Sequence, residues 1–189
     1  ATHGAIIIRS HGVTPAVRRS CEAQELPVID ATCPHVSRAQ KAAAKLAGEC
    51  GFVVVVGEAG HPEVEGLVAY AQEAGGSVCV AECGADLPDD LPEHVGVVVQ
   101  TTQTRDALED VLAGLKERGV EAEVKDTVCT ATRQRQQAAA KLAGEVDAIV
   151  VIGGRNSANT THLAEICAAE CPRTHHVESA AELDPVWFV

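Results

Sequence analysis

An internal repeat is the feature of this sequence that most limits the folds open to it. The octapeptide AAAKLAGE occupies residues 42–49 and returns at residues 138–145. The match continues in three more pairs of segments: VVVVG (53–57) with IVVIG (149–153), DATC (30–33) with DTVC (126–129), and AIIIRSHG (5–12) with GVVVQTTQ (96–103). Two copies of one supersecondary unit are therefore expected. We predict that they occupy residues 1–94 and 95–189, because the acidic, proline-containing stretch 84–94 is typical of a solvated connection.

Short runs rich in Val and Ile alternate with longer segments rich in Ala, Leu, Glu and Lys along the whole chain. This alternation is typical of parallel strands that are buried on both faces and joined by helices. We expect strands at 5–9, 27–30, 52–56, 77–80, 96–100, 121–125, 148–152 and 174–177. The sequence thus predicts an α/β fold of two pseudo-symmetric βαβαβ units, with mainly parallel sheets flanked by helices, facing a shared cleft.

Composition and charge exclude several classes of function. The 189 residues include 15 basic and 27 acidic side chains, giving a formal net charge of −12, and four aromatic residues. Such a chain has neither the positive surface nor the stacking groups that nucleic acid requires. No apolar run is long enough to cross a membrane, and no signal peptide opens the sequence. We therefore predict a cytoplasmic protein that binds neither nucleic acid nor membranes. Since the sequence contains no methionine, we also expect that a preceding segment is missing.

Polar residues follow the apolar strands at matching places in both copies. The first copy has Ser10, His11, Cys33, His61 and Glu63, and the second has Thr101, Thr102, Cys129, Ser157 and Asn159. Open α/β sheets bind their ligands beyond the carboxyl ends of the strands. We therefore expect these groups to converge on one cleft.

Cys33 and Cys129 hold equivalent positions, each between a short strand and a helix. The start of a helix favours the thiolate form, which is also the form that binds metal. The pair would supply half of a Cys₄ site, or two of three ligands of an iron–sulfur cluster with an open iron. Alternatively, both are small buried apolar residues. For the remaining cysteines we expect only a packing role: Cys21, Cys50, Cys79, Cys83, Cys167 and Cys171.

A second set of residues is suited to an anion. His11 and His61 lie where a strand meets a helix, and Ser157 and Asn159 add hydroxyl and amide groups at another such junction. Together with backbone N–H groups at helix starts, they would hold a phosphate or diphosphate. The alternative is that they are loop histidines and ordinary capping residues.

Glu63 follows His61 by two residues and would share its cleft. A carboxyl group beside a bound anion has a raised pKa and is a plausible proton donor. Thr101 and Thr102 offer hydroxyl groups to a substrate alcohol or to a proton relay, unless they serve only to cap a helix.

These motifs resemble a known family. SHGV, DATCP, GHPEVEG, QTT, a second cysteine ahead of TATRQRQ, and GGRNSANT follow one another as in the 4-hydroxy-3-methylbut-2-enyl diphosphate reductases, the IspH/LytB family. The resemblance covers essentially the whole chain, and GHPEVEG together with DATCP is its most specific part. It implies the last step of the methylerythritol phosphate route to isoprenoids, in which two electrons and two protons remove an allylic hydroxyl as water. The products are isopentenyl and dimethylallyl diphosphates.

The resemblance also implies a cofactor, partners and residue roles. The cofactor is a [4Fe–4S] cluster held by three cysteines, reduced by a donor such as ferredoxin or flavodoxin. By motif, Cys33 and Cys129 are cluster ligands, His11, His61, Thr101, Thr102, Ser157 and Asn159 bind the substrate, and Glu63 delivers a proton with the help of Thr101.

The sequence departs from the family pattern in three ways. Family members have a preceding segment with the third cluster cysteine and another histidine, and a following stretch with a last serine, and neither is matched here. Ala158 stands where a second serine is usual. We therefore expect a central fragment that is inactive alone. Two other hypotheses remain: a non-catalytic phosphate-binding or sensor module, and a zinc hydrolase that uses His61, Glu63 and a cysteine, although the spacing matches no zinc signature.

Overall fold

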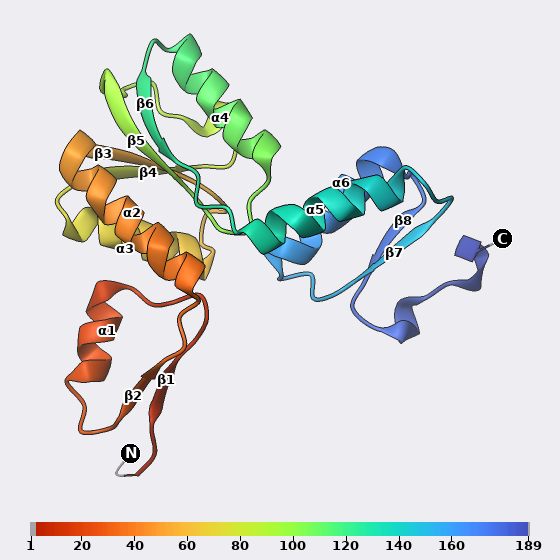
Figure 1. Cartoon of the computed structure of the whole chain (residues 1–189), viewed down its shortest axis with the longest axis horizontal. Coiled ribbons are helices and arrows are strands. Elements are labelled where there is room, and N and C mark those ends of the chain that lie inside the picture. The colour runs from red at the N-terminus through yellow and green to blue at the C-terminus, as the bar shows by residue number, and fades with distance from the viewer. Residues whose placement is uncertain (1–2, 189) are drawn as a thin grey trace. The chain divides into compact units, whose positions relative to one another are not determined.

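Parallel strands and helices alternate along the chain (Figure 1). The computed structural model describes residues 3–188, so the outermost residues of the two predicted ranges (1, 2 and 189) lie outside it. The elements are β1 (Ile6–Ile8), α1 (Pro15–Glu22), β2 (Val28–Asp30), α2 (Pro34–Cys50), β3 (Phe52–Val56), α3 (Pro62–Glu73), β4 (Ser77–Ala81), η1 (Gly84–Asp86), β5 (His94–Val99), α4 (Arg105–Glu117), β6 (Glu121–Lys125), α5 (Thr130–Ala143), β7 (Ile149–Ile152), α6 (Ala158–Glu170), β8 (Thr174–Val177), η2 (Ala180–Glu182) and η3 (Pro185–Phe188). Every predicted strand is present, with ends shifted by at most two residues, and the α/β class is confirmed.

Among the described residues 3–188, the strands form three sheets, in which every pair is parallel. β1 pairs with β2, β7 pairs with β8, and the largest sheet has the order β4-β3-β5-β6. This sheet joins strands from both sequence copies, because β5 lies beside β3 in a register that runs from Val53 opposite Gly96 to Val56 opposite Val99.

The chain divides into two compact units. Unit 1 consists of Ala1–Thr101 and Arg105–Thr127, and unit 2 of Thr102–Thr104 and Val128–Val189. These bounds differ from those of the sequence copies, because β5 and β6 extend the sheet that contains β3. The stretch 84–94 connects two strands of one sheet, and the backbone N–H of Gly84 donates to Asp110 Oδ2 of α4 at 2.8 Å.

The core of unit 1 lies around β3 and β5, whose valines are fully buried. In Figure 1, α2 and α3 cover one face of this sheet and α4 lies on the other. Gly96 of β5 admits α2 closely, since a Cβ there would lie 2.7 Å from Leu46 Cβ. The long apolar runs thus form a sheet that is covered on both faces, as expected for parallel strands.

Equivalent residues of the two sequence copies cap equivalent helices. Cys33 and Cys129 are the N-cap residues of α2 and α5. His61 and Ser157 are the N-cap residues of α3 and α6, and the side chain of each accepts a backbone N–H of its own helix. The two copies therefore place the same kind of capping position after equivalent strands.

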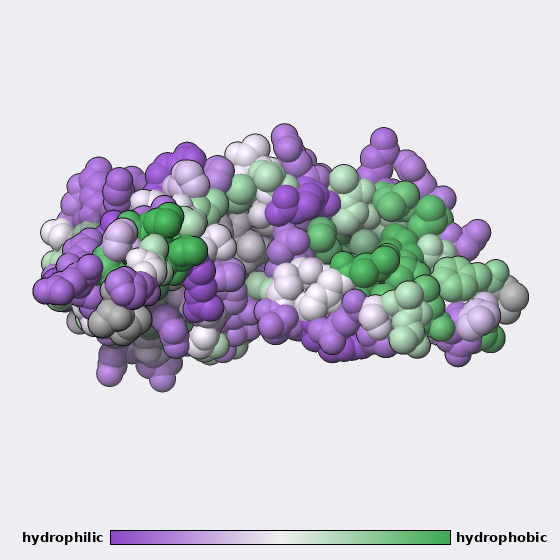
Figure 2. Space-filling model, turned by 90° about the horizontal axis from the view of Figure 1, so that it is seen from below, coloured by the Kyte–Doolittle hydropathy of each residue, from purple (hydrophilic) through white to green (hydrophobic). Residues whose placement is uncertain are grey.

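Unit 2 packs α5 and α6 against β7 and β8, with a small core that includes Ile149 and Cys167. Figure 2 shows hydrophobic residues on the surface of this part of the chain. Ile152 and Phe188 are 71% and 60% exposed, so part of this unit's apolar surface is open. Within residues 3–188, no helix combines the length and apolar character needed to cross a membrane.

Candidate functional site

Two glycines shape the loops that carry the predicted histidines. Gly12 follows His11 with a φ of 70°, in the left-handed region, and a Cβ there would lie 2.5 Å from Gln40 Nε2. Gly60 precedes His61 with a φ of 80°. L-residues with a side chain rarely adopt this conformation, so glycine at each position lets the chain turn and present the adjacent histidine.

Glu63 and Thr101 form a buried hydrogen-bonded pair in unit 1. The backbone N–H of Thr101 donates to Glu63 Oε1 at 2.6 Å, and the Thr101 hydroxyl donates to Glu63 Oε2 at 2.8 Å. Glu63 is 1% exposed and Thr101 is 5% exposed. Both carboxyl oxygens are thus fixed by one residue, which holds the carboxyl group in a single orientation.

Burial raises the pKa of Glu63 above its ordinary value, and the two hydrogen bonds from Thr101 oppose that rise. From the sequence, we expect a raised pKa because of the charge of a bound anion. Desolvation of the carboxylate raises it even without an anion. A carboxyl group that holds its proton more firmly than usual is suited to donate it to a leaving oxygen.

We expect the wild-type protein to lose stability relative to its Glu63→Gln variant as the pH rises above the ordinary glutamate pKa of 4.5. Because the pKa is raised in the folded state, the folded protein keeps a proton that the unfolded chain releases. The stability linked to that proton is complete below the unfolded-state pKa and is lost as the pH rises through the folded-state pKa. Urea denaturation of both proteins across this pH range measures the effect. A difference in unfolding free energy that does not change with pH contradicts it.

The other predicted residues of unit 1 lie around this pair. His61 Nδ1 accepts the backbone N–H of Glu63 at 3.1 Å, and the rings of His11 and His61 meet edge to face with centroids 5.5 Å apart. The backbone N–H of Cys33 donates to Ser10 O at 2.9 Å, beside His11. These contacts link His11, Cys33, His61, Glu63 and Thr101 into one chain of neighbours.

In unit 2, the predicted residues lie at the starts of α5 and α6 and in the loop after β5. The Ser157 hydroxyl accepts the backbone N–H of Thr160 at 3.4 Å, so it also serves as a cap. The carbonyl oxygen of Thr102 lies 2.9 Å from Nδ1 of His162 in α6. Thr101 and Thr102, which are adjacent in sequence, therefore fall in different compact units.

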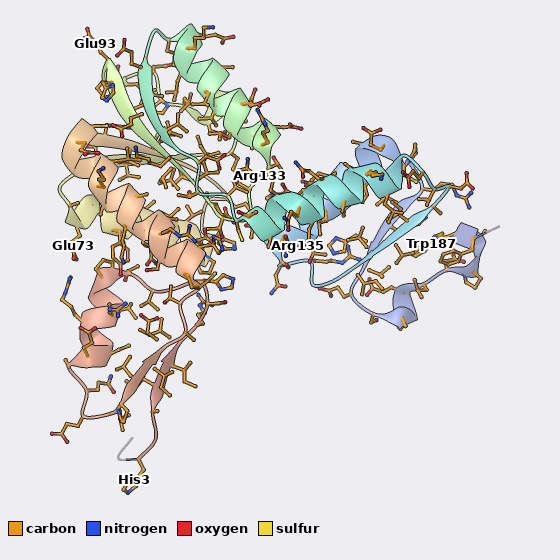
Figure 3. All side chains as sticks on the ribbon, in the orientation of Figure 1. His3, Glu73, Glu93, Arg133, Arg135 and Trp187 are labelled. Carbon is orange, nitrogen blue, oxygen red and sulfur yellow. The ribbon has the colours of Figure 1, made fainter. Side chains whose placement is uncertain are left out.

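Sequence reasoning assigned no role to several residues that support these positions. Arg135, in the first half of α5 (Figure 3), donates to Asn159 Oδ1 at 3.3 Å. The buried side chain of Gln100 accepts the backbone N–H of Glu58 at 2.9 Å and so ties the loop after β3 to the end of β5. The motif TATRQRQ contains Arg135, but spacing alone does not indicate which side chain on another helix it reaches.

Cys33 and Cys129 are of the right residue type to bind an iron–sulfur cluster through sulfur. Both are free cysteines of intermediate burial, and neither side chain makes a capping hydrogen bond at its helix. Cysteine sulfur is the usual ligand of iron–sulfur clusters, and at both positions it lies at the N-terminal end of a helix. The fit holds for each residue within its own unit.

A zinc hydrolase would require His61, Glu63 and a cysteine to lie together, and the described residues show no such group. Within the described part of the chain, the group of potential metal ligands whose atoms lie within 4.8 Å of one another consists of Cys50, His94 and Glu123. Neither His61 nor Glu63 belongs to such a group there.

Comparison with known proteins decides the family. A family model described as LytB protein matches residues 1–189. The chain belongs to the LytB family. The resemblance inferred from the motifs is thereby confirmed. The LytB match extends over both compact units.

Curated relatives of this LytB chain are named 4-hydroxy-3-methylbut-2-enyl diphosphate reductase. The protein of Citrifermentans bemidjiense is 50% identical over 189 residues, which cover 99% of this chain and 65% of the relative. That of Geobacter metallireducens is 49% identical over 191 residues, which cover 99% of this chain and 66% of the relative. The LytB chain thus spans about two thirds of the length of these relatives.

Solved structures agree with the fold of the LytB chain. One is described as (E)-4-hydroxy-3-methyl-but-2-enyl diphosphate reductase, the terminal enzyme of the non-mevalonate pathway. It is 40% identical to this chain, with a TM-score of 0.67, and the match covers 100% of this chain and 69% of the solved chain. The E-1-hydroxy-2-methyl-but-2-enyl-4-diphosphate reductase from Plasmodium falciparum is 26% identical, with a TM-score of 0.81. The match covers 94% of this chain and 57% of the solved chain.

Proposed function

We propose that the protein containing this chain is a 4-hydroxy-3-methylbut-2-enyl diphosphate reductase. In the overall reaction, the allylic C–O bond breaks and two electrons and two protons enter. One proton leaves with the hydroxyl oxygen as water, and the other joins the allyl carbon skeleton. The observation that carries the proposal is the buried Glu63–Thr101 pair beside His61, in a chain about half identical to proteins of that name.

In this proposal His11, His61, Ser157 and Asn159 hold the diphosphate, and Thr102 offers its hydroxyl to the substrate alcohol. The tautomer of His61 supports this role in diphosphate binding. Because Nδ1 accepts a backbone N–H, the proton of the neutral ring is on Nε2 and can be donated to a phosphate oxygen. Helix starts add backbone donors and the positive end of the helix dipole. Neutral donors of this kind bind an anion without a cluster of lysines.

Glu63 is the proposed proton donor to the departing hydroxyl. Its raised pKa keeps the carboxyl proton available nearer to neutral pH than an exposed glutamate would. Thr101 fixes the carboxyl oxygens from both its backbone and its side chain. We assign Thr101 a second role, in which its hydroxyl contacts the substrate oxygen and guides the proton.

The proposed cofactor is a [4Fe–4S] cluster, for which Cys33 and Cys129 supply two of three cysteine ligands. When bound, the cluster supplies electrons singly and a Lewis-acidic iron that polarises the C–O bond. The proposed partner is a one-electron donor such as ferredoxin or flavodoxin. The protein's residues contribute orientation, charge placement and the proton.

Iron and sulfide content distinguishes the reductase from a non-catalytic phosphate-binding or sensor module. The complete protein, produced without oxygen, is expected to be brown and to contain about four iron and four sulfide per chain. A colourless protein that binds diphosphate but contains neither element favours the sensor and contradicts the reductase.

Ala158 provides a separate test of the diphosphate site. It is the first residue of α6 and 6% exposed, next to Ser157. We expect Ala158→Ser to tighten substrate binding about fivefold, because one added neutral hydrogen bond is worth about 1 kcal/mol. Substrate KM measures this, with Ala164→Ser, further along α6, as the control. An unchanged or higher KM for Ala158→Ser contradicts the placement of the diphosphate at this helix start.

A further inference from the structure

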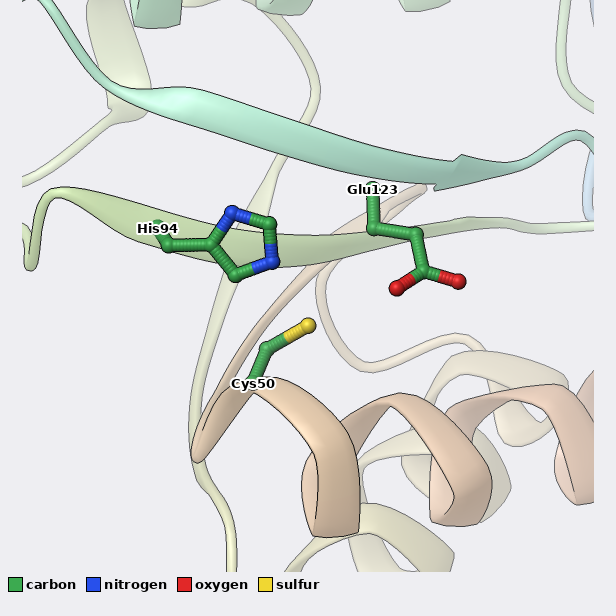
Figure 4. Close-up of side chains that lie close together, drawn as sticks. All are labelled: Cys50, His94 and Glu123. Carbon is green, nitrogen blue, oxygen red and sulfur yellow. The ribbon is translucent and has the colours of Figure 1, made fainter.

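Three side chains with metal-binding atoms meet at the far end of α2 from Cys33. Cys50 is the last residue of α2, His94 is the first residue of β5, and Glu123 lies in the middle of β6. Figure 4 shows their side chains turned toward one another. The sulfur, one ring nitrogen and one carboxyl oxygen all lie within 4.8 Å of one another.

The packing of α2 on the sheet brings these residues together. Leu46 lies over Gly96 of β5, which has no Cβ to keep the helix away. Cys50 is one helical turn beyond Leu46, and His94 lies two residues before Gly96 on the same face of the sheet. Glu123 is the register partner of Gly96 on β6. A close helix–sheet contact therefore fixes three ligands that are distant in sequence.

The donor types select a particular class of ion. Thiolate, imidazole and carboxylate together suit Zn²⁺ and similar transition metals, whereas Mg²⁺ and Ca²⁺ prefer oxygen ligands alone. With usual zinc bond lengths, a tetrahedral site places its ligand atoms roughly 3.5 Å apart. The three atoms of the cluster lie within 4.8 Å of one another, a limit that includes this spacing.

Charge around the cluster is mixed, and one lysine competes for a ligand. Glu123 and Glu49 bring negative charge near the Cys50 thiol, and Lys125 brings positive charge. Lys125 Nζ donates to Glu123 Oε1 at 2.6 Å. That contact engages one carboxyl oxygen, and the other can still bind a metal.

We propose that Cys50, His94 and Glu123 bind a divalent transition-metal ion of the Zn²⁺ type, with water completing the coordination. The site is independent of the proposed reductase centre, because Cys33 and Cys50 stand at opposite ends of a 17-residue helix, about 25 Å long. A bound ion would tie the end of α2 to β5 and β6 and would stabilise unit 1 by binding the folded state alone.

Cobalt(II) titration of the complete protein tests this site. Cys33 and Cys129 are first both changed to serine, so that the proposed cluster ligands do not contribute. We expect one equivalent of Co²⁺ to bind with a near-ultraviolet sulfur-to-cobalt charge-transfer band, and Zn²⁺ to displace it. In the same background, Cys50→Ser should remove the band, and His94→Ala should weaken binding at least roughly tenfold.

Two control variants test whether other thiols or histidines bind the metal ion. Cys21→Ser and His35→Ala change a cysteine and a histidine of unit 1 that do not belong to the cluster, and both should leave the titration unchanged. Circular dichroism of the metal-free proteins confirms folding. A band that survives Cys50→Ser, or no band in the parent, overturns the proposal.

Lys125 offers a variant with the opposite effect. Lys125→Gln releases Glu123 from its ion pair, so the affinity for Co²⁺ should rise at least roughly threefold. Lys45→Gln removes the same charge from a lysine paired with Glu49 and should have a smaller effect. Equal or weaker binding by Lys125→Gln than by Lys45→Gln removes Glu123 from the ligand set.

Discussion

Serine in place of Cys33 or Cys129 is expected to abolish retention of the iron–sulfur cluster in the complete protein. A serine hydroxyl is a hard and weakly acidic donor, whereas cluster iron is normally held by thiolate. Each cysteine is a helix N-cap whose thiol makes no capping hydrogen bond, so the fold should survive the change. Iron and sulfide analysis after purification without oxygen, together with the visible spectrum, measures the loss.

Cys50→Ser is the matched control for this loss, because Cys50 is also a partly buried thiol on α2. It should keep full iron and sulfide, even though it is expected to lose a separate divalent-metal site. Equal iron content in all three variants would remove the basis for assigning Cys33 and Cys129 to the cluster.

Glu63→Gln is expected to slow turnover about 10²- to 10⁴-fold while the affinity for the diphosphate stays near that of the wild type. Glutamine fills the same space and keeps an acceptor for the backbone N–H of Thr101, but it has no acidic proton to deliver. Steady-state kinetics with a chemical reductant gives the turnover number, and substrate titration of the oxidised protein gives the affinity.

Glu65→Gln provides the comparison, since Glu65 lies in the same first turn of α3 but is exposed. It should change neither quantity. Unchanged turnover in Glu63→Gln would deprive Glu63 of the acid role, and a large loss of affinity would assign it to substrate binding.

The strands and helix starts were predictable because their signals are local. Strands such as β3, β5 and β7 are short apolar runs. The repeated segments place Cys33 and Cys129 at equivalent helix starts. The link between Glu63 and Thr101 could be anticipated only as a shared sheet edge. Their two hydrogen bonds depend on β5 lying beside β3, a long-range pairing that no local pattern specifies.

The bounds of the compact units could not be derived from the repeat. Repetition identifies related segments, but strand pairing decides which segments share a sheet, and β5 and β6 extend the sheet of β3. The Cys50 cluster was missed for a similar reason. Its members come from three elements, and only the close contact of Leu46 with Gly96 brings them together.

Analysis of the reaction products shows whether the complete protein is a reductase. The complete protein, prepared without oxygen, is supplied with 4-hydroxy-3-methylbut-2-enyl diphosphate and a one-electron reductant, and the diphosphates are separated and identified. We expect the substrate to be converted to isopentenyl and dimethylallyl diphosphates with loss of water. Recovery of unchanged substrate from a protein that carries its full complement of iron and sulfide would contradict it.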